Sequence, residues 1–272
     1  MSDDLNPYAP PQSATATAPE DVGIPDGDLD AALAGRRPLN LSEVFKDAWR
    51  LVHGMKRSTA VATMVVGVVF IPLVGLLFGA LFLYSGIGLN MLASPVELEA
   101  TMAQLTQDPI YHLLAGLLSI PTSALSYMSL SNIGLRRAAG HDIRVRDAFP
   151  MQGLLKAATL LLMLWPLGTF NAIYPLAGLL TLPLYLCMFW VPAVLLDRED
   201  CSIFAAVKIS AGLIRHTLVF LLVNVAIVIV GYMVMVCSLG IAFFWFLPWV
   251  SCVYGVAWRR LAGLQSPRLT QP

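Results

Sequence analysis

Five hydroxyl side chains follow one another at helical spacing within an apolar part of the chain. Intervals of three and four residues place most of them on one face of a helix. They are Ser119, Thr122, Ser123, Ser126 and Ser129. Such a face can form a polar groove for a solute, or it can hold neighbouring helices together through hydrogen bonds. Asn224, in another apolar stretch, allows the same two interpretations, and we favour packing for both.

The sequence lacks the residue spacings that catalysis or metal binding requires. The four cysteines form no CxxC pair, and the four histidines are scattered singly. One close acidic group, made of Asp197, Glu199 and Asp200, has no candidate base or metal ligand beside it. It precedes Ser202, a candidate N-cap, and negative charge there favours the positive end of a helix dipole. We therefore expect no enzyme activity, no metal and no cofactor.

The composition is that of a membrane protein. Hydrophobic residues make up 57% of the chain and charged residues only 12%, with a mean hydropathy of +0.72. The 17 basic and 17 acidic residues cancel, so no nucleic-acid partner is expected. The middle of each predicted membrane helix lacks acidic and basic residues. This excludes a voltage sensor and disfavours a carrier driven by protons or sodium, because such proteins need intramembrane charges.

Four stretches of the sequence contain no charged residue. They are 58–96, 109–135, 157–196 and 217–258. A helix that crosses the hydrocarbon core needs about 20 apolar residues. The second stretch therefore holds one span, while the third and the fourth each have room for two. The first stretch is either one long span or a hairpin that turns near residues 72–75.

The distribution of basic residues decides between these two alternatives. One span in the first stretch gives six helices, near 59–84, 110–134, 155–173, 176–196, 217–237 and 241–258. All 17 lysines and arginines then lie on one side of the membrane, opposite Glu97, Glu99 and Asp108. Loops rich in lysine and arginine stay in the cytoplasm. We therefore predict an all-α, polytopic membrane protein with six transmembrane helices and with both the N-terminus and the C-terminus in the cytoplasm.

The predicted transmembrane domain covers residues 39–263. Residues 1–38 contain little that could bury apolar surface, so a disordered cytoplasmic leader is expected there. Residues 264–272 form a cytoplasmic tail.

Amphipathic helices are predicted near residues 41–54 and 202–215, with a weaker one at 143–155. Helices of this kind can lie in the headgroup plane, where membrane lipids are their partners. A protein partner could dock on them or on the leader. In the alternative interpretation, the amphipathic helices only frame the bundle.

Two segments and the start of the chain resemble a known group of proteins. The segments are 191–200, Val-Pro-Ala-Val-Leu-Leu-Asp-Arg-Glu-Asp, with the small-residue helix that follows it, and 254–263, Tyr-Gly-Val-Ala-Trp-Arg-Arg-Leu-Ala-Gly. The start is Asn-Pro-Tyr-Ala-Pro-Pro at 6–11. They resemble uncharacterised bacterial multi-pass inner-membrane proteins of the YciC-like kind. The resemblance implies a six-span bundle in the bacterial cytoplasmic membrane and brings no active site with it.

Two functions fit the sequence. The first is a non-enzymatic membrane protein that acts through contacts with lipids or partner proteins in envelope maintenance. The alternative is a transporter or facilitator for a neutral or amphiphilic solute. The alternative requires a continuous polar cavity that touches Ser119, Ser126 and Asn224.

Overall fold

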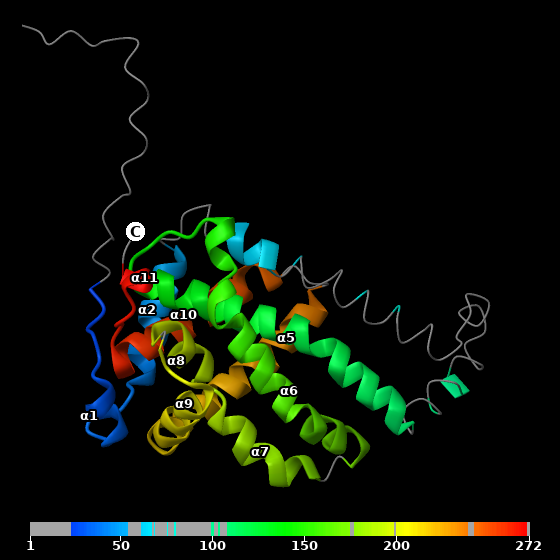
Figure 1. The fold of residues 1–272 in the computed structure, drawn as a ribbon. Coiled ribbons are helices and arrows are strands. Elements are labelled where there is room, and N and C mark those ends of the chain that lie inside the picture. Colours follow the sequence, from blue (N-terminus) through cyan, green and yellow to red (C-terminus); the bar gives the residue numbers. More distant parts are fainter. Residues whose placement is uncertain are drawn as a thin grey trace, which may run out of the picture.

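The computed structural model describes residues 23–53, 61–66, 68, 75, 79, 99–100, 103, 108–174, 177–198, 200–238 and 242–270. Within these residues every regular element is a helix, as the all-α prediction requires (Figure 1). The elements are α1 (Leu29–Leu33), α2 (Leu41–His53), α5 (Pro109–Ala138), the 3-10 helix η2 (Val145–Ala148), α6 (Met151–Ile173), α7 (Ala177–Cys187), α8 (Val191–Asp197), α9 (Ile203–Cys237), α10 (Phe243–Ala262) and α11 (Pro267–Thr270).

Two of the described helices are long and apolar enough to cross a membrane. They are α5, with 30 residues, and α9, with 35. Helices α6 and α10 also lie where spans were predicted, at 155–173 and 241–258. The first predicted span, 59–84, falls mostly outside the described residues. The structure thus supports an all-helical chain with two candidate spans, and the six-span layout stays a prediction.

Helix α9 corrects the prediction of a separate amphipathic helix at 202–215. That segment and the predicted span at 217–237 form one continuous helix. Its N-cap is Ser202, as predicted, whose hydroxyl accepts a hydrogen bond from the Ala205 amide at 3.2 Å. The helix continues because its buried residues keep a spacing of three and four across the expected junction. They are Ala206, Ser210, Leu213, Thr217, Phe220 and Leu221.

The span predicted at 176–196 is broken into α7 and α8. Helix α8 begins at Val191, and Pro192 follows directly. Proline has no amide hydrogen to bond the carbonyl four residues before it, and the Met188 carbonyl instead accepts a hydrogen bond from the Val191 amide at 3.1 Å. The Trp190 amide bonds the Ser210 hydroxyl of α9 at 3.0 Å instead of continuing the helix. The break therefore leaves backbone amides and carbonyls without their usual helical partners. Side chains of other helices, such as Ser210, form hydrogen bonds with them.

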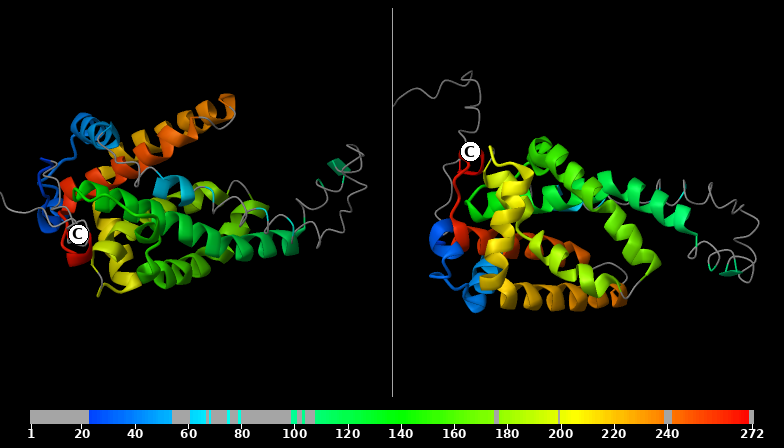
Figure 2. Two further views of the ribbon diagram at one scale, coloured as in Figure 1. Left: turned by 90° about the horizontal axis from the view of Figure 1, so that it is seen from above. Right: turned by 60° about the horizontal axis from the view of Figure 1, so that its bottom comes forward.

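Helices α5 and α10 pack more extensively than any other pair of described helices. They cross where Gly134 of α5 faces Gly255 of α10. A Cβ atom added at Gly134 would overlap the Ser251 carbonyl, and one added at Gly255 would overlap the Gly134 carbonyl. Small residues allow two helix backbones to approach this closely. From the end of the molecule that carries α1, α2 and α11, the helices spread apart (Figure 2).

The predicted disordered leader is ordered in its second part. Residues 23–38 pack on the bundle, while residues 1–22 lie outside the described residues. Helix α1 is capped by Asp28, and Leu29 and Ala32 are buried. Asp26 pairs with Arg259 of α10 at 2.7 Å. A few apolar residues at helical spacing, together with an ion pair, are thus sufficient to attach this segment.

Helix α2 frames the bundle, one of the two interpretations of the amphipathic segment at 41–54. Val44, Ala48 and Leu51 are buried against the bundle, and Phe45 stacks on Trp249 with a centroid distance of 5.8 Å. Trp49, which belongs to the same predicted apolar face, is 59% exposed. The helix therefore uses most of its apolar face for packing and keeps one aromatic side chain at the surface.

The weaker amphipathic helix predicted at 143–155 does not form as one unit. The structure has η2 in its first half and the start of α6 in its second half. Pro150 lies between them as the N-cap of α6. The proline fixes the backbone there and lacks an amide hydrogen, so one continuous helix is not favoured.

Candidate functional site

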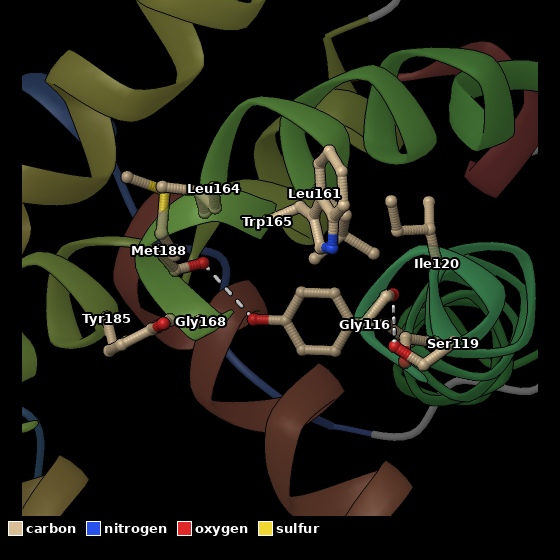
Figure 3. A pocket seen from close by; sticks show the side chains of 11 residues that line it. Gly116, Ser119, Ile120, Leu161, Leu164, Trp165, Gly168, Tyr185 and Met188 are labelled. Carbon is tan, nitrogen blue, oxygen red and sulfur yellow. Dashed lines mark hydrogen bonds between the residues drawn. The ribbon is translucent and has the colours of Figure 1, made fainter. Parts of the chain in front are cut away.

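An open groove of about 380 Å³ lies between α5, α6 and the end of α7 (Figure 3). It has the size of a small-molecule site, for which volumes of about 300–1,000 Å³ are usual. Figure 3 shows Ile120 of α5 facing Leu161 and Trp165 of α6 across the groove. The lining residues are Gly116, Ser119, Ile120, Ser123, Tyr127, Leu161, Leu164, Trp165, Gly168, Tyr185 and Met188.

The sequence explains why the helices leave space at this place. Gly116 on α5 and Gly168 on α6 line the groove without a side chain. Closer to the start of α5, the Trp165 indole donates a hydrogen bond to the Leu113 carbonyl at 3.0 Å. This bond fixes the large indole ring against α5. The two glycines therefore leave room in the wall of the groove, and the hydrogen bond holds the Trp165 ring at its edge.

Three hydroxyl groups of α5 line the groove one helical turn apart. The Ser119 hydroxyl donates to the Gly116 carbonyl at 2.7 Å. The Tyr127 hydroxyl donates to the Met188 carbonyl at 3.1 Å, which is one of the backbone groups at the break between α7 and α8. Ser123 lies between them, is exposed, and has no hydrogen-bond partner among the described residues. We call Ser119, Ser123 and Tyr127 the hydroxyl ladder.

The structure brings together two of the six predicted polar residues. Ser119 and Ser123 line the groove, whereas Ser126 and Asn224 do not. Thr122 is buried and donates to the Ser119 carbonyl at 2.7 Å, so it belongs to the helix packing.

Ser129 is also buried, and its hydroxyl has no partner among the described residues. The predicted polar face is therefore divided. Part of it lines the groove and part of it packs. The continuous polar cavity that the transport hypothesis requires is not found among the described residues.

Sequence reasoning missed the aromatic lining of the groove and the part played by Met188. Trp165 and Tyr185 stand in an apolar stretch where no pattern distinguishes a lining residue from one that faces lipid. The signal that could have located the site is Pro192, because a proline inside an apolar stretch predicts a break in the helix near it.

Side chains of three helices fix the broken segment beside the groove. The Tyr254 hydroxyl of α10 donates to the Phe189 carbonyl and accepts from the Ala193 amide, both at 3.1 Å. On α9, Thr217 accepts a hydrogen bond from the Trp190 indole at 3.1 Å. Tyr127 adds the bond from α5. These hydrogen bonds give the non-helical backbone of this segment partners on three other helices.

The groove is lined by apolar, hydroxyl and aromatic side chains, and none of the lining residues is an acid, a histidine, a lysine or an arginine. A serine nucleophile needs an adjacent base, and neither Ser119 nor Ser123 has one in the lining. In the part of the chain that the structure describes, no group of three His, Cys, Asp or Glu residues could hold a metal ion.

Comparison with protein-family models, with curated proteins and with solved structures finds no match to this chain. The resemblance to YciC-like membrane proteins therefore stays a prediction from the residues that suggest it.

Proposed function

We propose that this chain is a non-enzymatic, multi-pass inner-membrane protein that acts through lipid contacts in envelope maintenance. In this proposal, the groove between α5, α6 and α7 holds the hydrocarbon chain of a membrane amphiphile. The observation that carries the proposal is the position of this groove, which opens among helices whose outward side chains are apolar. Exposed apolar side chains of α5, α6 and α7 include Leu113, Leu117, Leu118, Leu162, Met163, Phe170, Leu182 and Leu184.

The exposed surface of α9 supports a lipid environment. Only 17% of its most apolar segment is buried inside the protein. Exposed side chains follow one another along the second half of the helix, among them Val225, Ile229, Val230, Met233 and Val234. Each Å² of apolar surface left in water costs about 25 cal/mol, so such a helix is stable where lipid covers it.

The charged end of the bundle supports a single cytoplasmic side for the basic residues. Arg137 is buried beneath α2, where its guanidinium donates to the Leu51 carbonyl. Arg260 of α10 forms ion pairs with Glu43 and Asp47 of α2. Lys156 of α6 donates to the carbonyl of residue 201 at 2.9 Å, beside the start of α9. The basic ends of α5, α6 and α10 thus meet at the end of the molecule where α1 and α2 pack, which fits the positive-inside rule.

The groove is suited to a hydrocarbon chain for two reasons. Its wall consists mainly of aliphatic and aromatic side chains, such as Ile120, Leu161 and Leu164. The helices that line it also carry exposed apolar side chains, which suits the entry of a lipid chain from the surrounding bilayer. Among the described residues, the groove does not continue to Ser126 or Asn224, and for this reason we favour lipid binding over solute transport.

Quenching of Trp165 tests the proposal. The full chain is reconstituted in phospholipid vesicles that contain a small, increasing mole fraction of mid-chain-brominated octadecane. We expect tryptophan fluorescence to fall with a saturable component, because bromine quenches only on contact and a groove of about 380 Å³ can be filled.

The saturable component should disappear in Trp165→Phe and persist in Trp245→Phe, since Trp245 is 67% exposed and lies outside the groove. Quenching that rises in simple proportion to the bromine content, with no difference between the two variants, would show that the groove binds no chain.

A further inference from the structure

We infer that the amphiphile in the groove has an uncharged headgroup that carries a hydroxyl, as in a long-chain alcohol or an acylglycerol. This inference rests on the proposed function and specifies its ligand class. It is carried by the hydroxyl ladder, by the hydrogen bonds already made there and by the position of the nearest cations.

The hydroxyl ladder lies in the middle of α5. With a rise of about 1.5 Å per residue, Ser119 is about 15 Å and Tyr127 about 27 Å from the start of the helix at Pro109. The whole helix of 30 residues is about 45 Å long. A headgroup that binds the ladder must therefore sit well inside the hydrocarbon layer. A headgroup that remains at the interface, as that of a phospholipid does, cannot reach Ser123 or Tyr127.

Hydrogen bonds within the protein leave the ladder able mainly to accept. The Ser119 proton is donated to the Gly116 carbonyl and the Tyr127 proton to the Met188 carbonyl. Each hydroxyl oxygen keeps lone pairs that can accept a further hydrogen bond. Ser123 can both donate and accept, because it has no partner among the described residues. A ligand hydroxyl matches this set, since it can donate to one oxygen of the ladder and accept from Ser123.

An anionic headgroup does not match it. Carboxylates and phosphates only accept hydrogen bonds, and Ser123 is the one hydroxyl of the ladder with a proton to give. The lining contains no lysine, arginine or histidine to neutralise the charge. An ionised group without a partner is costly in a medium of low polarity.

The nearest cations along the helices are out of reach. Arg136 lies nine residues beyond Tyr127 on α5, which is about 13 Å along the axis. Lys156 on α6 lies five residues before Leu161, the nearest lining residue of that helix, which is about 8 Å along the axis, and its amine is held away from the groove by a hydrogen bond to the Cys201 carbonyl. A cationic headgroup would also lack a partner of opposite charge, because none of the residues that line the groove is an acid. Only a neutral headgroup can bind at this depth without an unpaired charge.

A headgroup series tests the inference with the same chain and the same quenching signal. The probes are mid-chain-brominated octadecanol, its sulfate monoester and the corresponding trimethylammonium salt, each added to vesicles that contain the full-length protein. We expect the alcohol to reach half-saturation of the Trp165-dependent quenching at a mole fraction at least tenfold lower than either charged probe.

Ser123→Ala should raise the half-saturation value for the alcohol three- to tenfold, because one hydrogen bond is lost. Ser126→Ala is the matched control, since this serine lies one residue before Tyr127 but does not line the groove, and it should leave the value unchanged. Equal half-saturation for all three probes, or an unchanged value in Ser123→Ala, would overturn the inference and leave the chain-binding proposal standing. A complete lack of saturable quenching with every probe would overturn both.

Discussion

Replacing Gly134 by leucine should abolish folding of the bundle. A side chain at this position would displace the backbone of α10, because a Cβ there overlaps the Ser251 carbonyl and lies 2.8 Å from the Ser251 carbonyl carbon. No rotamer change relieves an overlap with backbone, so the two helices must separate. Overpacking of a core usually costs about 1–3 kcal/mol. We expect more than this even for Gly134→Ala, since α5 and α10 form the largest helix contact in the described part of the chain.

Thermal unfolding and size-exclusion profiles in mild detergent measure this effect. Gly134→Leu should aggregate, and Gly134→Ala should unfold at a temperature at least 10 °C lower, since about 1 kcal/mol shifts the midpoint by a few degrees in a chain of this size. Gly75→Ala is the control, because a Cβ at Gly75 meets nothing within 4 Å. If Gly134→Ala eluted and unfolded like the original protein, the close crossing of α5 and α10 would be wrong.

Replacing Asp197 by alanine should release the C-terminal segment from the bundle. Asp197 is only 2% exposed and accepts three hydrogen bonds. They come from the amides of Gln265 and Ser266 at 2.7 and 3.1 Å and from the Trp258 indole at 3.3 Å. A buried donor that loses its acceptor costs about 1–3 kcal/mol. We therefore expect a loss of about 3 kcal/mol or more, with most of it concentrated around α11.

Limited trypsin digestion at Arg268, combined with thermal unfolding, measures this loss. Cleavage should be at least tenfold faster in Asp197→Ala. In Asp197→Asn the increase should be smaller, because an amide oxygen can still accept from the two backbone amides. Asp30→Ala, a substitution at an exposed aspartate of α1, should behave like the original chain. Equal cleavage rates in Asp197→Ala and Asp30→Ala would contradict the structural role assigned to the Asp197 carboxylate.

Asp197 is a residue whose structural role could not be predicted from the sequence. Its place in an acidic group before Ser202 suggested a role at the start of the following helix. In the structure the carboxylate points instead to Trp258 and to the chain after α10. Ser202 caps α9 as predicted, since an N-cap depends only on residues three positions apart. The Asp197 contacts join residues more than sixty positions apart, and no local pattern records them.

The difference between local patterns and contacts of distant residues also explains which features of the helices could be predicted. Their existence and approximate positions were predictable, because long runs of apolar residues without charges determine them. The continuity of α9 through residues 215–217 was not, because it depends on burial of Leu213, Thr217 and Phe220 against other helices. The packing of α1 depends in the same way on its contact with α9 and α10.

The sequence predicted part of the groove lining, namely two serines of α5, but not the rest. Spacing on α5 correctly identified Ser119 and Ser123 as neighbours on one face. Spacing could not separate them from Thr122 and Ser129, which lie on the packed side. That division depends on where α6 and the end of α7 meet α5, and therefore on Gly168 and Met188.

The central claim is that the apolar helices cross a bilayer and that their basic ends lie in the cytoplasm. Labelling of introduced cysteines from each side of the membrane tests this claim most directly. Cys187, Cys201 and Cys237 are replaced by serine, while the buried Cys252 is kept. Glu99→Cys and Gln265→Cys, both at exposed positions, are then treated with a membrane-impermeant thiol reagent on intact bacterial spheroplasts. The cysteine at 99 should be labelled at once, and the cysteine at 265 only after the membrane is permeabilised. Labelling of the cysteine at 265 in intact spheroplasts, or protection of the one at 99, would contradict the account.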